Sequence, residues 1–223
     1  MSDVLVLTGI TLFKRIVAAG FRLLFRAVAR VRVEGLEHVP RSGPLLVVAN
    51  HTTIADPPFV AAWLQPALGR PIQFMAKEQL FGSPLRPLLQ AFGAVRVRAG
   101  GSDVEAYRVG VALLRGGGVL GLFPEGTRSP TGVMAKPHAG VALIAARSGV
   151  PVLPVGISGG QRLLAPGARL PRFGVRLRLR VGQPFLVTLD RSLERRQATQ
   201  AAADGIMGRI AALVEPEQRG RFG

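Results

Sequence analysis

The sequence contains no cysteine among its 223 residues. This absence excludes disulfide bonds, thiolate metal sites and a cysteine nucleophile, and we expect a chain exposed to the cytosol. Acidic residues are also few, because 13 Asp and Glu stand against 29 Lys and Arg, for a formal net charge of +16. A chain this basic is expected to bind an anionic partner, such as nucleic acid, an anionic lipid surface or a phosphorylated substrate.

Aromatic residues are scarce, at 6% of the chain, and the sequence has neither zinc-ligand spacing nor a phosphate-binding Walker sequence. These absences argue against a nucleic-acid-binding module, so we expect no specific nucleic acid as a partner. Hydrophobic residues nevertheless make up 48% of the chain. This content argues against a disordered basic tail and favours contact with a membrane.

Long hydrophobic runs are missing as well. Uncharged runs fall short of the roughly 20 residues that a membrane-spanning helix needs. The N-terminus lacks the order of a signal peptide, because Asp3 precedes the first apolar run and the cations follow it. We therefore expect a single domain that is not exported and that lies at the cytoplasmic face of the cell membrane as a peripheral or monotopic protein.

Residues 9–30 have the pattern of an amphipathic helix. At 100° per residue, four arginines fall in one narrow stripe, and a broad apolar face lies opposite; the arginines are Arg15, Arg22, Arg26 and Arg30. This pattern is typical of a helix that lies in the membrane interface, and an anionic membrane surface is the partner that it implies. The alternative is an ordinary helix packed on the domain with its arginines in water. We assign residues 1–32 to a basic membrane-interface helix and residues 33–223 to the main domain.

A histidine and a carboxylate follow the first predicted strand. The apolar run 44–49 predicts a buried parallel strand, and it leads into His51, with Asp56 five residues later as the expected N-cap of a helix over 57–64. On a straight helix residues five apart point about 140° apart, whereas a strand-to-helix turn can bring the carboxylate back to the imidazole. A histidine can remove a proton from a hydroxyl near neutral pH, and a carboxylate can orient it. Taken alone, this spacing is weak evidence for catalysis.

Further strands and helices alternate along the chain. The pattern predicts an α/β fold: a single domain with a mixed, mostly parallel sheet flanked by helices, preceded by the amphipathic helix. Prolines in the strand at 150–155 predict an edge or irregular position for it. The predicted helices cover 103–115, 140–148 and 192–214, and the predicted strands cover 119–123, 150–155 and 175–181.

The second motif, Glu125-Gly126-Thr127-Arg128, directly follows the predicted strand at 119–123. It supplies a guanidinium, a hydroxyl and backbone amides beside a glycine, which together suit the binding of phosphate oxygens. A plain turn with a solvated arginine is the alternative. Because ligands of open α/β sheets gather outside the carboxyl ends of the strands, we expect this loop and the His51 loop to border one crevice.

Four blocks in order make the sequence resemble a known family. They are Asn50-His51 to Asp56, Phe74 to Val95, Phe123 to Ser129 and Val150 to Pro154. The chain is similar to the glycerolipid acyltransferases, and most closely to the 1-acylglycerol-3-phosphate O-acyltransferases, over roughly residues 33–187. The resemblance implies transfer of an acyl group from an acyl-CoA or acyl carrier protein thioester to lysophosphatidate, without a covalent enzyme intermediate, a metal or a cofactor.

The resemblance also implies roles for particular residues. His51 would be the general base and Asp56 the group that orients it. In the second block the family's arginine position holds Ala99, so Arg98 or Arg96 would replace it. Residues implied in substrate binding are Arg98, Glu125, Gly126, Thr127, Arg128 and Lys136.

Other functions remain open at this point. An acyltransferase could act on a different lysolipid or polar lipid. Gly-x-Ser-x-Gly around Ser158 matches the nucleophile elbow of serine hydrolases, but every histidine precedes Ser158, whereas those enzymes place it after the serine. A non-catalytic membrane-surface binder is the third possibility, and the intact His51, Asp56 and Arg128 argue against it.

Overall fold

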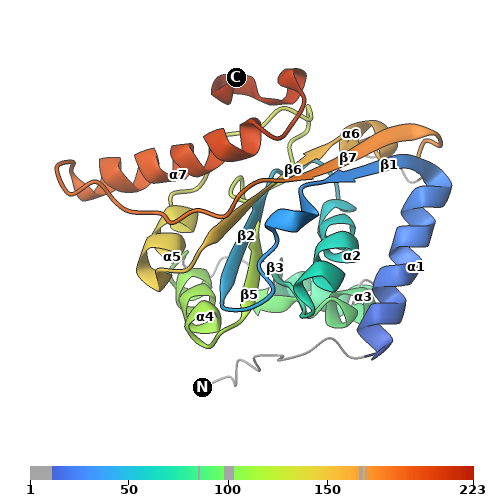
Figure 1. The fold of residues 1–223 in the computed structure, drawn as a ribbon, viewed down its shortest axis with the longest axis horizontal. Helices are drawn as coiled ribbons and strands as arrows, with labels where there is room; N and C mark the ends of the chain where they lie inside the picture. Colours follow the sequence, from blue (N-terminus) through green and yellow to red (C-terminus); the bar gives the residue numbers. More distant parts are fainter. Residues whose placement is uncertain (1–11, 85, 98–102, 166–167, 169) are drawn as a thin grey trace.

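A mixed sheet forms the centre of the computed structural model, which describes residues 12–84, 86–97, 103–165, 168 and 170–223 (Figure 1). The strands lie in the order β1-β7-β6-β2-β5-β3-β4, and neighbours are parallel except for the antiparallel pair β6 and β7. This arrangement confirms the predicted α/β fold with a mostly parallel sheet. The strands are β1 Ala29–Glu34, β2 Leu45–Ala49, β3 Gln73–Lys77, β4 Val95–Val97, β5 Val119–Leu122, β6 Val152–Ser158 and β7 Val175–Val181.

Strand β2 lies between β5 and β6 and is buried along its whole length. Because successive side chains of a strand point to opposite faces, Leu45 and Val47 join one hydrophobic core, and Leu46 and Val48 join the other. A strand covered on both faces reads as a continuous apolar run, which explains why the sequence alone located it.

Helices cover both faces of the sheet. The core on one face receives side chains from α1 and α2, and the core on the other face receives them from α4, α5 and α7. The short helix α6 follows β6 directly and leads toward β7. The helices are α1 Leu12–Val28, α2 Asp56–Leu68, α3 Arg86–Ala91, α4 Asp103–Arg115, α5 Gly140–Ser148, α6 Gly160–Leu163 and α7 Arg195–Ala211.

Helix α1 carries apolar side chains on both its inner and its outer face. Its inner face packs on α2, where the ring of Phe25 meets those of Phe59 and Trp63 at 4.9 and 6.0 Å between centroids. Its outer face leaves large apolar side chains in water, and these are Leu12, Ile16, Leu23 and Leu24. The inner face agrees with the alternative of a helix packed on the domain, and contact of the outer face with a membrane stays a prediction. Residues 9–11 of the expected helix lie outside the described part of the chain, and among the described helices none is long and apolar enough to cross a membrane.

The structure differs from the sequence-based expectation in strand β6. It is an interior strand between β2 and β7, so the edge position predicted from its prolines is wrong. Pro154 lies one residue before Val155, the first residue of β6 that pairs with β7. Its missing N–H removes a donor at the end of that ladder rather than within it, and its carbonyl accepts a hydrogen bond from the Gly182 N–H at 2.9 Å.

Residues 29–32 differ from the predicted segment boundary. The helix ends at Val28, and the chain continues as β1, whose residues pair with β7 in register from Ala29↔Val175 to Glu34↔Arg180. The sheet thus begins inside the segment that the sequence assigned to the membrane-interface helix.

Candidate active site

The turn that follows β2 is fixed to the neighbouring strand by Asn50. Its side-chain amide donates to the carbonyl of Ile157 at 2.9 Å, and its side-chain oxygen accepts from the Ile157 N–H at 2.8 Å. Asn50 is completely buried, and these two hydrogen bonds hold the carboxyl ends of β2 and β6 next to each other. The next residue, His51, therefore emerges from a rigid point at the edge of the sheet.

The side chains of His51 and Asp56 meet. Nδ1 of His51 lies 2.9 Å from Oδ2 of Asp56, as a tight strand-to-helix turn allows. The same Oδ2 accepts the backbone N–H groups of Thr52 and Thr53 at 2.6 and 2.7 Å, and Oδ1 accepts the Thr53 hydroxyl at 3.0 Å. Because the carboxyl group accepts from all of these donors, Nδ1 of His51 must donate to it. Nε2 is then the free acceptor of the ring.

Asp56 differs in one respect from its sequence-based interpretation. It was expected to be the N-cap of the following helix, but the N-cap is Ala55 and Asp56 is already the first residue of α2. Its carboxylate bonds to residues before the helix rather than to the first helical amides. The aspartate is thus committed to the His51 turn.

The Glu-Gly-Thr-Arg loop is joined to the His51 turn. Glu125 is 3% exposed, and its two carboxylate oxygens accept the backbone N–H groups of His51 at 3.0 Å and of Ala135 at 3.1 Å. The Ser129 N–H donates to the carbonyl of His51 at 2.8 Å. Burial raises the pKa of Glu125, and the two amide hydrogen bonds offset part of that rise. The predicted convergence of the two loops is therefore present in the structure.

The imidazole of His51 is supported by an aromatic stack. The centroid of its ring lies 4.1 Å from that of Phe123, and the two rings are nearly parallel. Phe74 in turn stacks on Phe123, with 5.7 Å between their centroids. Phe123 comes from the end of β5, and Phe74 from β3. The stack holds the plane of the ring while the Asp56 contact fixes its rotation, so one orientation of His51 is favoured.

His138 was missed as a site residue by the sequence reasoning. Gly126 has a φ of +67°, and a Cβ at that position would lie 2.8 Å from two atoms of the His138 ring. The imidazole therefore covers the glycine of the second motif, and the His138 N–H donates to the Pro124 carbonyl at 2.8 Å. Position 138 lies twelve residues after Gly126, and no local pattern links the two.

A cavity of about 280 Å³ opens beside the two motifs. Thr52 and Thr53 come from the first motif, and Thr127 and Arg128 from the second, so two of the predicted substrate-binding residues line it. The opposite wall is apolar and comes from the chain after α6; the remaining lining residues are Ile54, Ser129, Pro130, Leu164, Ala165 and Ala168. The combination of one exposed cation with an apolar wall suits an amphipathic anion.

Other predicted site residues are placed differently. Lys136 is exposed, next to Ala135, and is not part of the cavity lining. Arg98 and Ala99 lie outside the described residues. Arg96 is described, but its guanidinium lies 3.6 Å from Glu78 and over the ring of Phe81, so it is engaged elsewhere.

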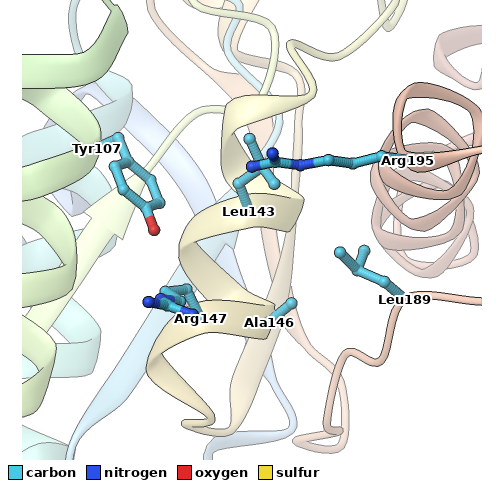
Figure 2. Close-up of a pocket in the computed structure, with 6 residues that line it drawn as sticks. All are labelled: Tyr107, Leu143, Ala146, Arg147, Leu189 and Arg195. Atoms are coloured by element: carbon cyan, nitrogen blue, oxygen red, sulfur yellow. The ribbon is translucent and has the colours of Figure 1, made fainter. Parts of the chain in front are cut away.

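A larger cavity, of about 560 Å³, lies between α4, α5 and the beginning of α7. Figure 2 shows Arg195 reaching from α7 toward α5, with Tyr107 on the far side. Neither sequence motif contributes to its lining, which also contains Leu143, Ala146, Arg147 and Leu189. Residues of both motifs line the smaller cavity, although His51 and Asp56 are not among its lining residues, and we take it as the candidate acceptor site.

Ser158 does not have the setting of a catalytic nucleophile. It is buried in β6, and its hydroxyl accepts the Glu215 N–H at 3.2 Å. Its backbone lacks the strained left-handed conformation of a sharp elbow, since glycines alone have positive φ in the described chain. The neighbouring Gly160 has a packing role, because a Cβ there would lie 2.7 Å from Oγ1 of Thr52 and 3.2 Å from Oδ1 of Asp56.

Comparison with known proteins identifies the family. The Acyltransferase family profile matches residues 30–158, which is more than half of the chain and includes both motifs. The chain belongs to the Acyltransferase family. Its fold is similar to the crystal structure of the 1-acyl-sn-glycerophosphate acyltransferase PlsC from Thermotoga maritima, with a TM-score of 0.66 and 29% sequence identity over 87% of this chain and 76% of that one.

Curated relatives carry two different acceptors in their names. A chloroplastic 1-acyl-sn-glycerol-3-phosphate acyltransferase of Arabidopsis thaliana is 29% identical over 62% of this chain and 39% of its own length. A lyso-ornithine lipid O-acyltransferase of Pseudomonas aeruginosa is 33% identical over 65% of this chain and 53% of its own length. The chain thus spans between two fifths and about half of these relatives.

Proposed function

We propose that this acyltransferase transfers a fatty acyl group from an acyl thioester to the free hydroxyl of lysophosphatidate, giving phosphatidate. The observation that carries the proposal is the 2.9 Å contact between His51 and Asp56, joined through Glu125 to the loop that bears Arg128. This geometry combines a proton acceptor with a cation about one loop away. Such a pairing suits an acceptor that has both a hydroxyl group and a phosphate.

In the proposed reaction His51 acts as the general base. Nε2 removes the proton from the acceptor hydroxyl as its oxygen attacks the thioester carbonyl, and the ring becomes an imidazolium that Asp56 stabilises. The tetrahedral intermediate then collapses, the C–S bond breaks, and the leaving thiolate takes the proton from the imidazolium. The products are the acylated lipid and a free thiol, so no covalent enzyme intermediate is formed. The donor is the thioester of coenzyme A or of acyl carrier protein.

The acceptor phosphate is assigned to the cavity lined by Arg128 and Thr127. The guanidinium and the hydroxyl can both donate to phosphate oxygens, and the backbone of the loop turns at Gly126. Glycerol and acyl parts of the acceptor would face the apolar wall after α6. The lyso-ornithine lipid relative favours a second candidate, in which the same site acylates a lysolipid without this phosphate.

Membrane association is part of the proposal. The outer face of α1 carries exposed leucines and an isoleucine, and Arg15 and Arg26 are exposed on the same helix. Burying such apolar side chains at the headgroup boundary, beside cations that attract anionic lipids, is favourable. We assign the protein to the cytoplasmic face of the cell membrane, where a lysolipid acceptor is found.

The acceptor is tested with a panel of lysolipids and a thiol-reactive dye. Purified protein is given acyl-CoA together with lysophosphatidate, lyso-ornithine lipid or monoacylglycerol, and the released thiol is followed; the chain itself contributes no thiol background. We expect the largest kcat/KM with lysophosphatidate. A preference for lyso-ornithine lipid would select the second candidate. Thiol release that needs no acceptor would contradict acyl transfer.

Arg128→Ala tests the phosphate assignment in the same assay. Loss of a charge-assisted hydrogen bond of about 1.5–3 kcal/mol predicts a KM for lysophosphatidate that rises about 10- to 100-fold, with little change for monoacylglycerol. Arg147→Ala is the matched control, because that arginine is exposed but lines the other cavity. An equal loss with both acceptors would contradict the phosphate role.

A further inference from the structure

Two large apolar side chains stand in water on the segment between α6 and β7. Leu170 is 80% exposed and Phe173 is 75% exposed, the highest values among the large hydrophobic residues of the described chain. A single exposed leucine is ordinary on a protein surface, but a leucine and a phenylalanine three residues apart form a local apolar tip. We call residues 170–176 the corner segment.

The corner segment is attached to the end of α1. The Gly174 N–H donates to the carbonyl of Val28, the last residue of that helix, at 2.9 Å. Figure 1 shows α1, α6 and the first residues of β1 and β7 at the same end of the molecule. The tip therefore lies next to the helix whose outer face exposes Leu23 and Leu24.

Uncompensated arginines surround this tip. Arg30 and Arg176 are the second residues of β1 and β7, and they lie directly opposite each other. Arg172 lies inside the corner segment. All three are exposed and have no ion-pair partner among the described residues. Like charges placed opposite each other destabilise a pair of strands.

Farther along the same two strands the arginines are neutralised. Glu34 pairs with Arg32 and with Arg180, and Glu215 pairs with Arg178. Within these two strands, the unpaired arginines therefore lie at the end that is next to the apolar tip. Cations beside exposed Leu and Phe fit a surface of anionic headgroups over hydrocarbon.

Residues shortly before the corner segment belong to the smaller cavity. Leu164, Ala165 and Ala168 line this cavity together with Arg128, and Leu170 follows two residues after the last of them. The apolar part of the cavity lining thus lies close in sequence to the exposed tip. A lipid acceptor that entered laterally from a bilayer at the tip would meet these lining residues first.

We propose that the corner segment, with Arg30, is a second membrane contact beside α1, seated on an anionic bilayer so that the cavity-lining residues Leu164, Ala165 and Ala168 lie toward the lipid surface. The occupant is an anionic bilayer, because exposed apolar side chains and free arginines occur together there. The lateral entry of the acceptor rests on the proposed function, whereas bilayer contact by residues 170–176 does not.

Fluorescence quenching tests the contact. Phe173→Trp places a tryptophan at the tip. Leu186→Trp is the matched control, because Leu186 is also exposed but follows Phe185, which forms a β-bridge with Val152 at the beginning of β6. The native Trp63 is buried and gives the background in the unchanged protein. With vesicles containing phosphatidylglycerol and brominated lipid, we expect quenching of position 173 and not of position 186. Equal quenching at both positions, or none at 173, would overturn the proposal.

A double variant gives the functional test. Leu170→Ser with Phe173→Ser should lower affinity for phosphatidylglycerol vesicles by about tenfold or more, since both apolar contacts are lost. Transfer to lysophosphatidate held in vesicles should fall in parallel, while transfer to a short-chain, monomeric acceptor stays unchanged. Leu186→Ser with Leu193→Ser is the control and should bind as the unchanged protein does.

The outcomes separate the two proposals. Protein without transferase activity on any acceptor would reject the proposed function, and the quenching data would still decide the contact. Unchanged vesicle affinity of the double variant would reject the contact. If that variant instead lost affinity for acyl carrier protein alone, the corner would be a protein-docking surface and the proposal would be wrong.

Discussion

Glu125 is the side chain that holds the two functional loops in one place. The sequence resemblance implies a substrate-binding role, and that role stays a prediction. The geometry gives Glu125 a positioning role, because both carboxylate oxygens are occupied by the backbone amides of His51 and Ala135. A buried carboxylate that is fully engaged in this way fixes the position of the His51 backbone.

Stability as a function of pH tests the state of Glu125. Burial raises the pKa of Glu125 in the folded protein above the ordinary value of 4.5. At pH values between the ordinary and the raised pKa, the folded state therefore binds more protons than the unfolded state. The free energy of unfolding should therefore fall as pH rises through the interval and then become level. Glu125→Gln lacks this titration. In urea titrations between pH 4 and 8, the stability of the unchanged protein minus that of the variant should decrease with pH, and an increase would contradict a raised pKa.

Side-chain predictions from the sequence were limited by distance along the chain. His51 and Asp56 could be paired from the sequence because five residues within one turn bring them together. The contact between Glu125 and His51 spans 74 residues and depends on the order of β2 and β5 in the sheet. The stacking of Phe123 on His51 also depends on the order of the strands. In the sequence, Phe123 is recognisable only as the end of a predicted strand.

At the scale of strands and helices, the site depends on adjacent strand ends. The turn after β2 and the loop after β5 leave the sheet side by side, and Asn50 ties the first of them to β6. The elements that the sequence predicted well have clear local boundaries. Helices α4 and α5 have the predicted limits, and Gly116 and Gly149 follow their last residues.

Strands that were not predicted depend on their neighbours. β3 and β4 are five and three residues long, and they form by pairing with β5 and with each other. Neither has enough residues for an alternating pattern to stand out. β1 was hidden for another reason, because its second residue, Arg30, continues the basic stripe of the helix before it.

Asn50→Ala tests the connection between β2 and β6. In the variant the backbone N–H of Ile157 loses its acceptor, and the carbonyl of Ile157 loses one of its donors. This loss should lower the free energy of unfolding by about 1–3 kcal/mol. Because His51 is the next residue, kcat should fall more than KM changes. Gln183→Ala, at an exposed position, is the control. Unchanged stability and unchanged kcat in the Asn50 variant would contradict the positioning role of this pair.

For the whole molecule, one arrangement accounts for the composition. Free arginines and exposed apolar side chains occur together near the outer face of α1 and the corner segment, although other exposed arginines, such as Arg108 and Arg147, lie elsewhere in the described chain. The His51 turn stands at the carboxyl end of β2, and the cavity beside it is lined by both motifs and by the chain after α6.

The most direct test of this account is acyl transfer by His51→Ala. Loss of a general base typically lowers the rate by about 10²- to 10⁴-fold, so thiol release with lysophosphatidate should nearly disappear. The variant should still fold, and its affinity for anionic vesicles should stay unchanged, because the imidazole belongs neither to the two hydrophobic core clusters nor to the proposed membrane-facing surface. Near-normal turnover in this variant would contradict the central claim that His51 activates the lipid hydroxyl.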